Sequence, residues 1–167
     1  GYQVLLPVLD SFARTSAGDL PLSLALNDAH DIFIVNGGIA TVSGLDALPQ
    51  MIKTCLSTLR GEMSLHPNFG ARIQEYFELF RGSPWLPRLI KLEVIRLACL
   101  PYGDPVAKQY TPLRSVLRVK SVEQLVSSSE DNWIPFRFHL DVKGVGLWQC
   151  DLPIFVPHRY LEQSQKL

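Results

Sequence analysis

Residues Asp31–Ser43 read DIFIVNGGIATVS and give the first clear structural signal in this chain of 167 residues. Two runs rich in β-branched residues flank the sequence Asn36-Gly37-Gly38. Asn and Gly tolerate the positive φ angles that a tight turn requires, so the pattern predicts a β-hairpin. The segments on either side of this hairpin can then be interpreted in order.

A first helix is predicted directly after the hairpin, ending at Gly61. Asp46 is a candidate N-cap, and Pro49 falls in the first turn, where its missing N–H costs little. Apolar residues recur at spacings of three and four, which predicts one buried stripe. This stripe consists of Leu48, Ile52, Cys55, Leu56 and Leu59.

Two more helices are predicted, over residues 70–80 and 84–99. Ile73, Phe77 and Phe80 share one face of the earlier one. Gly82-Ser83-Pro84 breaks the chain between them, and Ser83 can cap the later helix. The apolar stripe expected on that last helix consists of Leu89, Leu92, Ile95 and Cys99.

The periodicity changes to two after a loop over residues 101–112. Strands are predicted within residues 116–121, 136–142 and 146–156, with a turn at residues 144–146. Strands and helices in separate blocks predict an α+β fold. We expect a β-hairpin, about three helices, and then a small mixed or antiparallel C-terminal sheet.

The chain length and the order of the predicted elements indicate the domain organisation. A length of 167 residues is typical of one domain. We assign residues 29–167 to a single α+β domain and residues 1–28 to an N-terminal arm that can reach a neighbouring subunit. The polar segment 158–167 is expected to be a loose tail.

Charge and hydropathy narrow the class of protein. The chain has 16 basic and 16 acidic residues, which argues against a general binder of nucleic acid or of anionic membranes. Apolar residues make up 47%, charged residues only 19%, and the mean hydropathy is +0.11. A neutral, charge-poor surface tends to associate. The composition therefore fits either an ordinary globular domain or a subunit of an assembly.

Motifs for cofactors, metals and covalent catalysis are missing from the sequence. The three cysteines and four histidines are scattered, which predicts neither a disulfide framework nor a zinc site. No phosphate-binding loop or nucleophile elbow occurs. No apolar run is long enough for a membrane span, and the first residues do not resemble a signal peptide. We expect no cofactor, no metal and no catalytic residue.

A family resemblance is carried by three short motifs that follow the hairpin. They are VSGLDALPQ at residues 42–50, LRGE at residues 59–62, and HPNFG at residues 66–70. Together with the hairpin they resemble the phage baseplate wedge family, also called the gene-twenty-five-like or W-protein family. The resemblance extends from Asp31 to Phe80, near a third of the chain.

The resemblance implies a structural role and no enzymatic activity. Members of this family lie in the inner baseplate of contractile phage tails and related injection machines. They clamp a helical bundle formed by other wedge subunits, and their exposed strands template the first ring of sheath subunits. The strand-rich region Val116–Val156 is the candidate template here.

The location and partners follow from the same resemblance. It implies a virion protein of the tail baseplate, assembled in the host cytoplasm, with six copies per particle. Its partners would be the other wedge subunits and the tail sheath protein, with neither nucleic acid nor membrane. The sequence leaves open whether the particle is a phage, a tailocin or a secretion machine.

The chain departs from the family after the third predicted helix, where members carry a Glu-Pro-Arg-like motif that contacts the bundle. Asp104-Pro105-Val106 lacks the arginine, and Thr111-Pro112-Leu113-Arg114 lacks the glutamate. Arg114 or Arg118 is expected to replace the family's arginine. The candidate partner-binding residues are Arg60, Glu62, His66, Pro67, Gly70, Pro112, Arg114 and Arg118.

Two other functions stay open at this stage. The first is a peptidoglycan-degrading, lysozyme-like enzyme in which Glu62 pairs with Glu75 or Asp46, one acid protonated and the other ionised. Against it, Glu62 can instead bind backbone N–H groups in its loop, and His66 can bond to the backbone in the same way. The second is an α+β adaptor unrelated to any phage.

Overall fold

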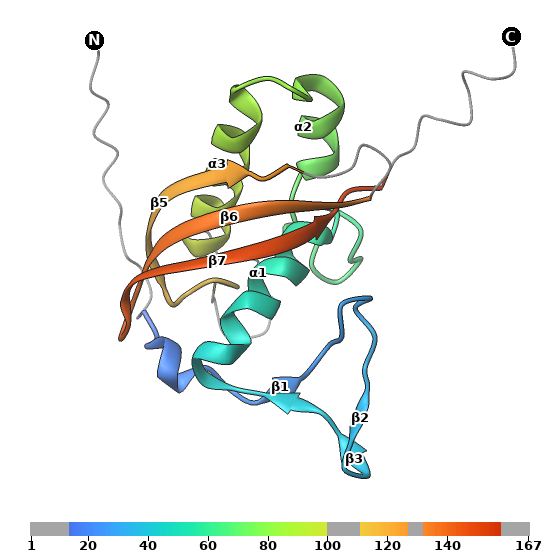
Figure 1. The fold of residues 1–167 in the computed structure, drawn as a ribbon, viewed down its shortest axis with the longest axis vertical. Helices are drawn as coiled ribbons and strands as arrows, with labels where there is room; N and C mark the ends of the chain where they lie inside the picture. The colour runs from blue at the N-terminus through green and yellow to red at the C-terminus, as the bar shows by residue number, and fades with distance from the viewer. Residues whose placement is uncertain (1–13, 100–110, 127–131, 158–167) are drawn as a thin grey trace, which may run out of the picture.

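The computed structural model describes residues 14–99, 111–126 and 132–157 (Figure 1). Its helices are α1 (Ala47–Ser57), α2 (Ile73–Phe80) and α3 (Trp85–Cys99), with 3-10 turns η1 (Ala17–Asp19) and η2 (Gly44–Asp46). Its strands are β1 (Ser23–Leu24), β2 (Ile34–Val35), β3 (Gly38–Ile39), β4 (Thr41–Val42), β5 (Val116–Gln124), β6 (Trp133–Val142) and β7 (Gly146–Phe155). The predicted α+β class is confirmed, and so are the three helices.

The C-terminal sheet is an antiparallel meander of β5, β6 and β7, with β6 in the centre. Gly144 and Gly146 take positive φ angles of 85° and 86° in the turn between β6 and β7. The register from this turn runs without interruption to the pair Trp133 and Phe155. Of the two arrangements expected, the sheet is therefore the antiparallel one.

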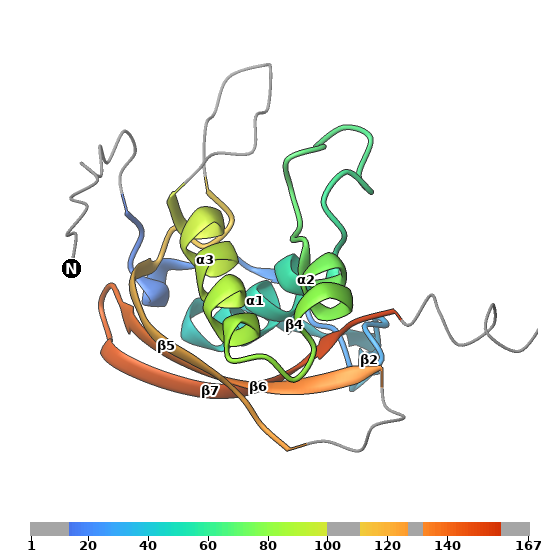
Figure 2. The same ribbon diagram turned by 90° about the horizontal axis from the view of Figure 1, so that it is seen from above.

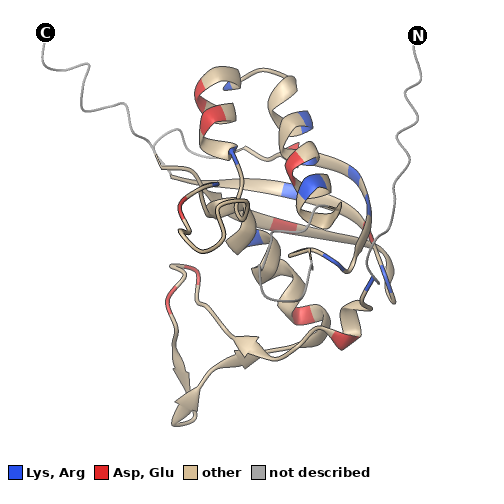
Figure 3. Ribbon diagram, turned by 180° about the vertical axis from the view of Figure 1, so that it is seen from behind, with Lys and Arg blue, Asp and Glu red and all other residues tan. Residues whose placement is uncertain are grey.

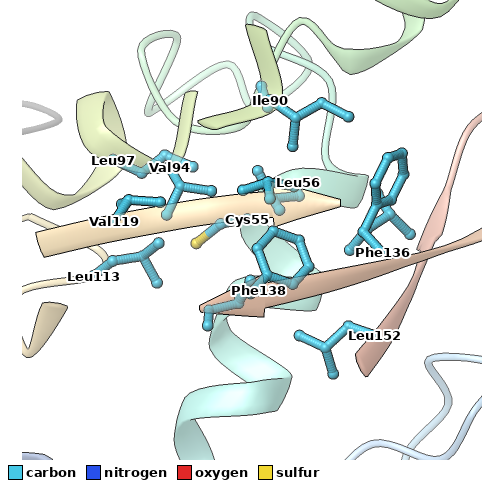
Figure 4. Close-up of a cluster of buried hydrophobic side chains, with 14 of the residues drawn as sticks. Cys55, Leu56, Ile90, Val94, Leu97, Leu113, Val119, Phe136, Phe138 and Leu152 are labelled. Atoms are coloured by element: carbon cyan, nitrogen blue, oxygen red, sulfur yellow. The ribbon is translucent and has the colours of Figure 1, made fainter. Parts of the chain in front are cut away.

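The helices cover one face of this sheet (Figure 2). Central strand β6 alternates strictly, because its even-numbered residues are buried and its odd-numbered residues are half-buried. Phe136 and Phe138 are fully buried, and the close-up in Figure 4 shows them with side chains from α1 and α3. Burial of a phenylalanine side chain stabilises the fold by up to about 3 kcal/mol. The core therefore lies between the sheet and these two helices.

Four of the five residues predicted for the buried stripe of α1 are buried, namely Leu48, Ile52, Cys55 and Leu56. The fifth, Leu59, lies beyond the end of the helix and is half-buried, and the two ends of the helix also differ from the prediction. Asp46 belongs to the turn η2, and its side chain makes no capping hydrogen bond. An N-cap side chain commonly accepts the N–H three residues later, and that residue is Pro49, which has none. The helix ends at Ser57, before Gly61, because the chain turns at Thr58 to pair with Ala71.

The stripe predicted for α3 lies at the margin of the buried face of the helix. Ile95 and Cys99 are partly buried against the core, but they are not its centre. Leu92 is 60% exposed, whereas the fully buried positions are Leu86, Ile90, Val94 and Leu97. Both sets have helical spacing and the same apolar character, so periodicity alone does not separate them. Packing against β5 and α2 selects the second set.

Strand β5 also departs from the simple alternation expected for residues 116–121. Val116, Val119 and Val122 are buried at intervals of three, while Leu117 and Arg118 are both exposed. Register shifts between Val116 and Arg118, and between Val119 and Ser121, account for the difference. Such bulges insert an extra residue and bend an edge strand.

The segment before residue 29 is part of the folded domain wherever the structure describes it. Ala17 and Leu20 are buried in the core. The backbone N–H of Ala17 donates to the carbonyl of Lys143, and that of Gly44 donates to Leu20. The expected arm over residues 1–28 therefore does not hold from residue 14 onward, and residues 1–13 lie outside the described residues.

The hairpin predicted within residues 31–43 is confirmed. Asn36 and Gly37 have φ angles of 52° and 78°, and Ile34 pairs with Ile39 across the two short strands β2 and β3. The next residues of the same strand form β4 and pair with β1. The hairpin projects away from the sheet and the three helices (Figure 1).

Candidate functional site

The loop between α1 and α2 is closed at its base by backbone hydrogen bonds. Ala71 N–H donates to Thr58 over 2.9 Å, and Arg60 N–H donates to Ala71 over 3.1 Å. Gly70 lies in this base with a φ angle of 85°. A Cβ atom at Gly70 would lie 2.6 Å from the carbonyl oxygen of Thr58. The HPNFG motif therefore needs its last glycine for a close approach of two backbones.

Arg60 and Glu62 hold the path of this loop. The Glu62 Oε2 atom accepts the backbone N–H of Leu59 over 3.0 Å. The Arg60 guanidinium donates to the side chain of Asn68 over 3.1 Å. Of the two roles weighed for Glu62, the backbone contact is the one present here. Both side chains are exposed, so they can also face a partner.

His66 and Pro67 lie near the tip of the loop. The backbone of His66 donates to Met63 and accepts from Phe69, which closes two consecutive turns. Leu65 beside them is 83% exposed. The motif thus places a rigid backbone under an exposed apolar tip.

Arg96 on α3 secures the loop and was missed by the sequence analysis. Its guanidinium donates to the carbonyls of Asn68 and Gly70 and to the carboxylate of Glu93, 2.7 Å away. Glu93 is buried and also accepts the hydroxyl of Tyr76 over 2.9 Å. Burial and this hydrogen bond raise the pKa of Tyr76. The only sign of this ion pair in the sequence is the spacing of three residues between Glu93 and Arg96, which places both on one side of a helix.

Pro112 and Arg114 line an apolar groove beside this loop. The groove has a volume of about 390 Å³ and lies between β1, α1, Phe69 and residues 111–114. Arg114 is the one charged side chain among its lining residues. Arg118 lies elsewhere, opposite Asp141 in the sheet. The structure therefore places Arg114, and not Arg118, beside the loop that carries the resemblance; residues 104–106 lie outside the described residues.

The thiols of Cys55 and Cys150 are unsuited to nucleophilic catalysis. Cys55 lines the apolar groove, and burial raises the pKa of its thiol to about 12. Burial likewise raises the pKa of Cys150 to about 12. Thiols in this state are protonated at neutral pH and are poor nucleophiles.

The outer edge of β5 is occupied by basic side chains. The carbonyl of Val116 accepts the guanidinium of Arg14 over 3.0 Å, and that of Lys120 accepts the ammonium of Lys91 over 2.7 Å. Together with the two bulges, these contacts interrupt the ladder on this edge between Val116 and Ser121. A strand from another chain would have to displace them.

Among the described residues, no strand pairs with the outer edge of β7. The N–H of Phe155 donates to Ser57 Oγ, so odd-numbered residues direct their backbone groups away from β6. Leu147, Gln149 and Asp151 have no backbone partner on that side within the described ranges. Pro153 has no N–H to offer, which is usual for an edge strand.

One of the two carboxylate pairs considered for an enzyme, Asp46 with Glu62, is too widely separated to act on one bond. Asp46 and Glu62 lie at opposite ends of α1, and eleven helical residues span about 16 Å. Paired glycosidase carboxylates lie no more than about 9.5 Å apart. Glu75 is exposed in the first turn of α2. Within residues 14–99, 111–126 and 132–157, no three His, Cys, Asp or Glu side chains are grouped to hold a metal ion.

A second cluster fixes the loop at the base of the hairpin. His30 has a φ angle of 65°, and its ring packs edge-on against Trp133 at 5.0 Å. The ammonium of Lys53 lies 4.8 Å from the centre of the same indole and donates to the carbonyl of Asp28. Burial and the charge of Lys53 lower the pKa of His30, although Asp31 opposes the shift.

We expect this cluster to make stability depend on pH. Because the pKa of His30 is lower in the folded chain, the stabilisation is complete above about 6.5, the ordinary histidine value, and is lost as the pH falls through the folded value. Urea unfolding at pH 7.5 and pH 5 tests this. His30→Asn keeps a residue that tolerates positive φ and should show a smaller loss at pH 5. An equal loss in both proteins would remove His30 as the cause.

Comparisons with known protein families, with curated proteins and with solved structures find no match to this chain. In the part of the chain that the structure describes, no helix is long and apolar enough to cross a membrane.

Proposed function

We propose that this chain is a structural component of the inner baseplate of a contractile phage tail or a related injection machine. In this role it clamps a helical bundle of other wedge subunits and templates the first ring of sheath subunits by strand addition. The observation that carries the proposal is the open outer edge of β7. The motifs of residues 42–70 support it independently.

The two edges of the sheet differ in a way that favours β7 as the template. Arg14 and Lys91 occupy carbonyls on the edge of β5. On β7, the outward backbone groups of Leu147, Gln149 and Asp151 offer both donors and acceptors. An incoming strand that pairs with them would extend the three-stranded sheet to four strands.

The groove beside the loop supports the clamp on a helical bundle. An amphipathic helix typically places an apolar stripe into such a groove. Leu24, Met51 and Phe69 supply apolar walls, and the position of Arg114 would match an acidic side chain on the helix. Arg114 thus takes the role that the resemblance gives to the family's arginine.

Gln149→Pro tests the strand-addition role in particles. The variant removes one outward N–H and leaves the bonds between β6 and β7 in place, as the natural Pro153 does at an equivalent position. We expect sheathed tails, counted by electron microscopy, to fall at least tenfold.

Gln149→Thr is the matched control, because it changes the same side chain and keeps the N–H. It should assemble sheath like the unaltered chain. Normal sheath with Gln149→Pro, in a protein that unfolds at the usual temperature, would rule out β7 as the template. A fall in sheathed tails with both variants would assign the effect to the glutamine side chain and not to the N–H.

A further inference from the structure

The projecting hairpin carries a continuous aliphatic face. Ile34 pairs with Ile39, and Leu24 pairs with Thr41 two residues further along the same strand. Side chains alternate along a strand, so these positions share one side of the sheet. We define the aliphatic face by its five large members, which are Leu22, Leu24, Ile32, Ile34 and Ile39.

This face is exposed and carries no charge. The exposed fractions of its five side chains range from 47% at Leu24 to 73% at Ile34. No charged residue occurs from Ile32 to Leu45. Figure 3 shows the hairpin without acidic or basic positions, whereas the helices and the sheet carry both. Soluble monomers rarely leave an apolar patch of several hundred Å² in water.

We propose that a second copy of this chain covers the aliphatic face in a two-fold symmetric dimer. In such a contact the same patch of both copies meets, so a charged residue within it would lie near the same charge on the other copy. A charge-free patch avoids that repulsion, and the zero net charge of the chain removes long-range repulsion between copies. Five large aliphatic residues supply a substantial part of the roughly 800 Å² that each partner buries in a standard interface.

A second copy fits this face better than a lipid surface. Hydrocarbon requires every backbone N–H and C=O to be satisfied, and a two-stranded hairpin leaves its outer edges unpaired. The loop at the base also carries Asp28 and Asp31, whose charge opposes approach to an anionic membrane. This dimer contact does not include the outer edge of β7, so the inference does not rest on strand addition. It shares Leu24 with the groove proposed for the helical bundle, so a second copy and the bundle would compete for that residue.

Sedimentation velocity of the full chain over a range of micromolar concentrations tests the dimer. We expect a reversible monomer–dimer equilibrium. The double variant Ile34→Thr/Ile39→Thr keeps β-branched residues in the strands and removes apolar area from the face. Its dimer dissociation constant should be at least tenfold higher.

Leu65→Thr is the control, because it removes an even more exposed aliphatic side chain from the loop between α1 and α2. It should leave the dissociation constant unchanged. A chain that stays monomeric at every concentration would overturn the proposal, and so would a dimer that the double variant does not weaken. Binding of the unaltered chain, but not of the double variant, to phosphatidylcholine vesicles would also overturn it and assign the face to lipid.

Discussion

Gly70→Ala should lower the free energy of unfolding by about 3 kcal/mol or more. A residue with a Cβ atom resists the φ angle of 85° found here. The new methyl group would also lie 2.6 Å from the carbonyl oxygen of Thr58 and 3.0 Å from that of Leu59. The Thr58 oxygen accepts the N–H of Ala71 and the Leu59 oxygen accepts that of Glu62, so a shift of either oxygen breaks a hydrogen bond of the loop. Urea unfolding followed by circular dichroism measures the loss.

Gly61→Ala separates the two causes. Gly61 has a φ angle of 91°, but nothing lies within 4 Å of the position of its Cβ atom. It should therefore lose only the conformational part, about 1 to 2 kcal/mol. Equal losses for the two variants would show that the close approach at Gly70 contributes nothing.

Arg96→Met should cost about 3 to 5 kcal/mol, the range for removing one partner of a buried ion pair. The guanidinium holds the carbonyls of Asn68 and Gly70, and it is the cation bonded to buried Glu93. Methionine fills much of the same volume but leaves the Glu93 carboxylate without its counter-ion. Thermal and urea unfolding measure the effect.

Two further variants test this explanation. Adding Glu93→Gln to Arg96→Met removes the buried charge and should recover part of the loss. Arg60→Met removes an exposed arginine with its bond to Asn68 and should cost less than about 1 kcal/mol. If Arg60→Met lowered the free energy of unfolding as much as Arg96→Met does, the stability of the loop would depend on any nearby arginine and not on the pair of Arg96 with Glu93.

Local signals allowed the hairpin and the helices to be predicted. Asn36 and Gly37 specify the turn by their own conformational preferences, and Ser83 accepts the N–H of Trp85 as a cap does. The cap expected from Asp46 failed because this residue lies in η2 with helical backbone angles, whereas an N-cap residue is extended. The stripe of α3 failed because two apolar stripes share that helix, and only contacts with distant strands choose between them.

Fewer contacts of the candidate site could be predicted from the sequence, because they join segments that lie far apart in the chain. Gly70 and Glu62 were singled out from their motif, and the loop places both in structural contacts. Arg96 is 26 residues from Gly70, and Arg14 is 102 residues from Val116. No local pattern reveals such pairs. The choice of β7 over β5 depends on them, as does the choice of Arg114 over Arg118.

The far end of β7 has a consequence for the geometry of assembly. Pro153 lacks an N–H, and the N–H of Phe155 is taken by Ser57, so a strand added to this edge meets a fixed stop after Asp151. A uniform edge would allow slippage by two residues, a displacement of about 6.8 Å. With the stop, every copy would hold its added strand at the same height. If the chain templates sheath as proposed, six copies would present a level starting ring, and one proline and one serine hydroxyl would set the axial alignment of the whole tube.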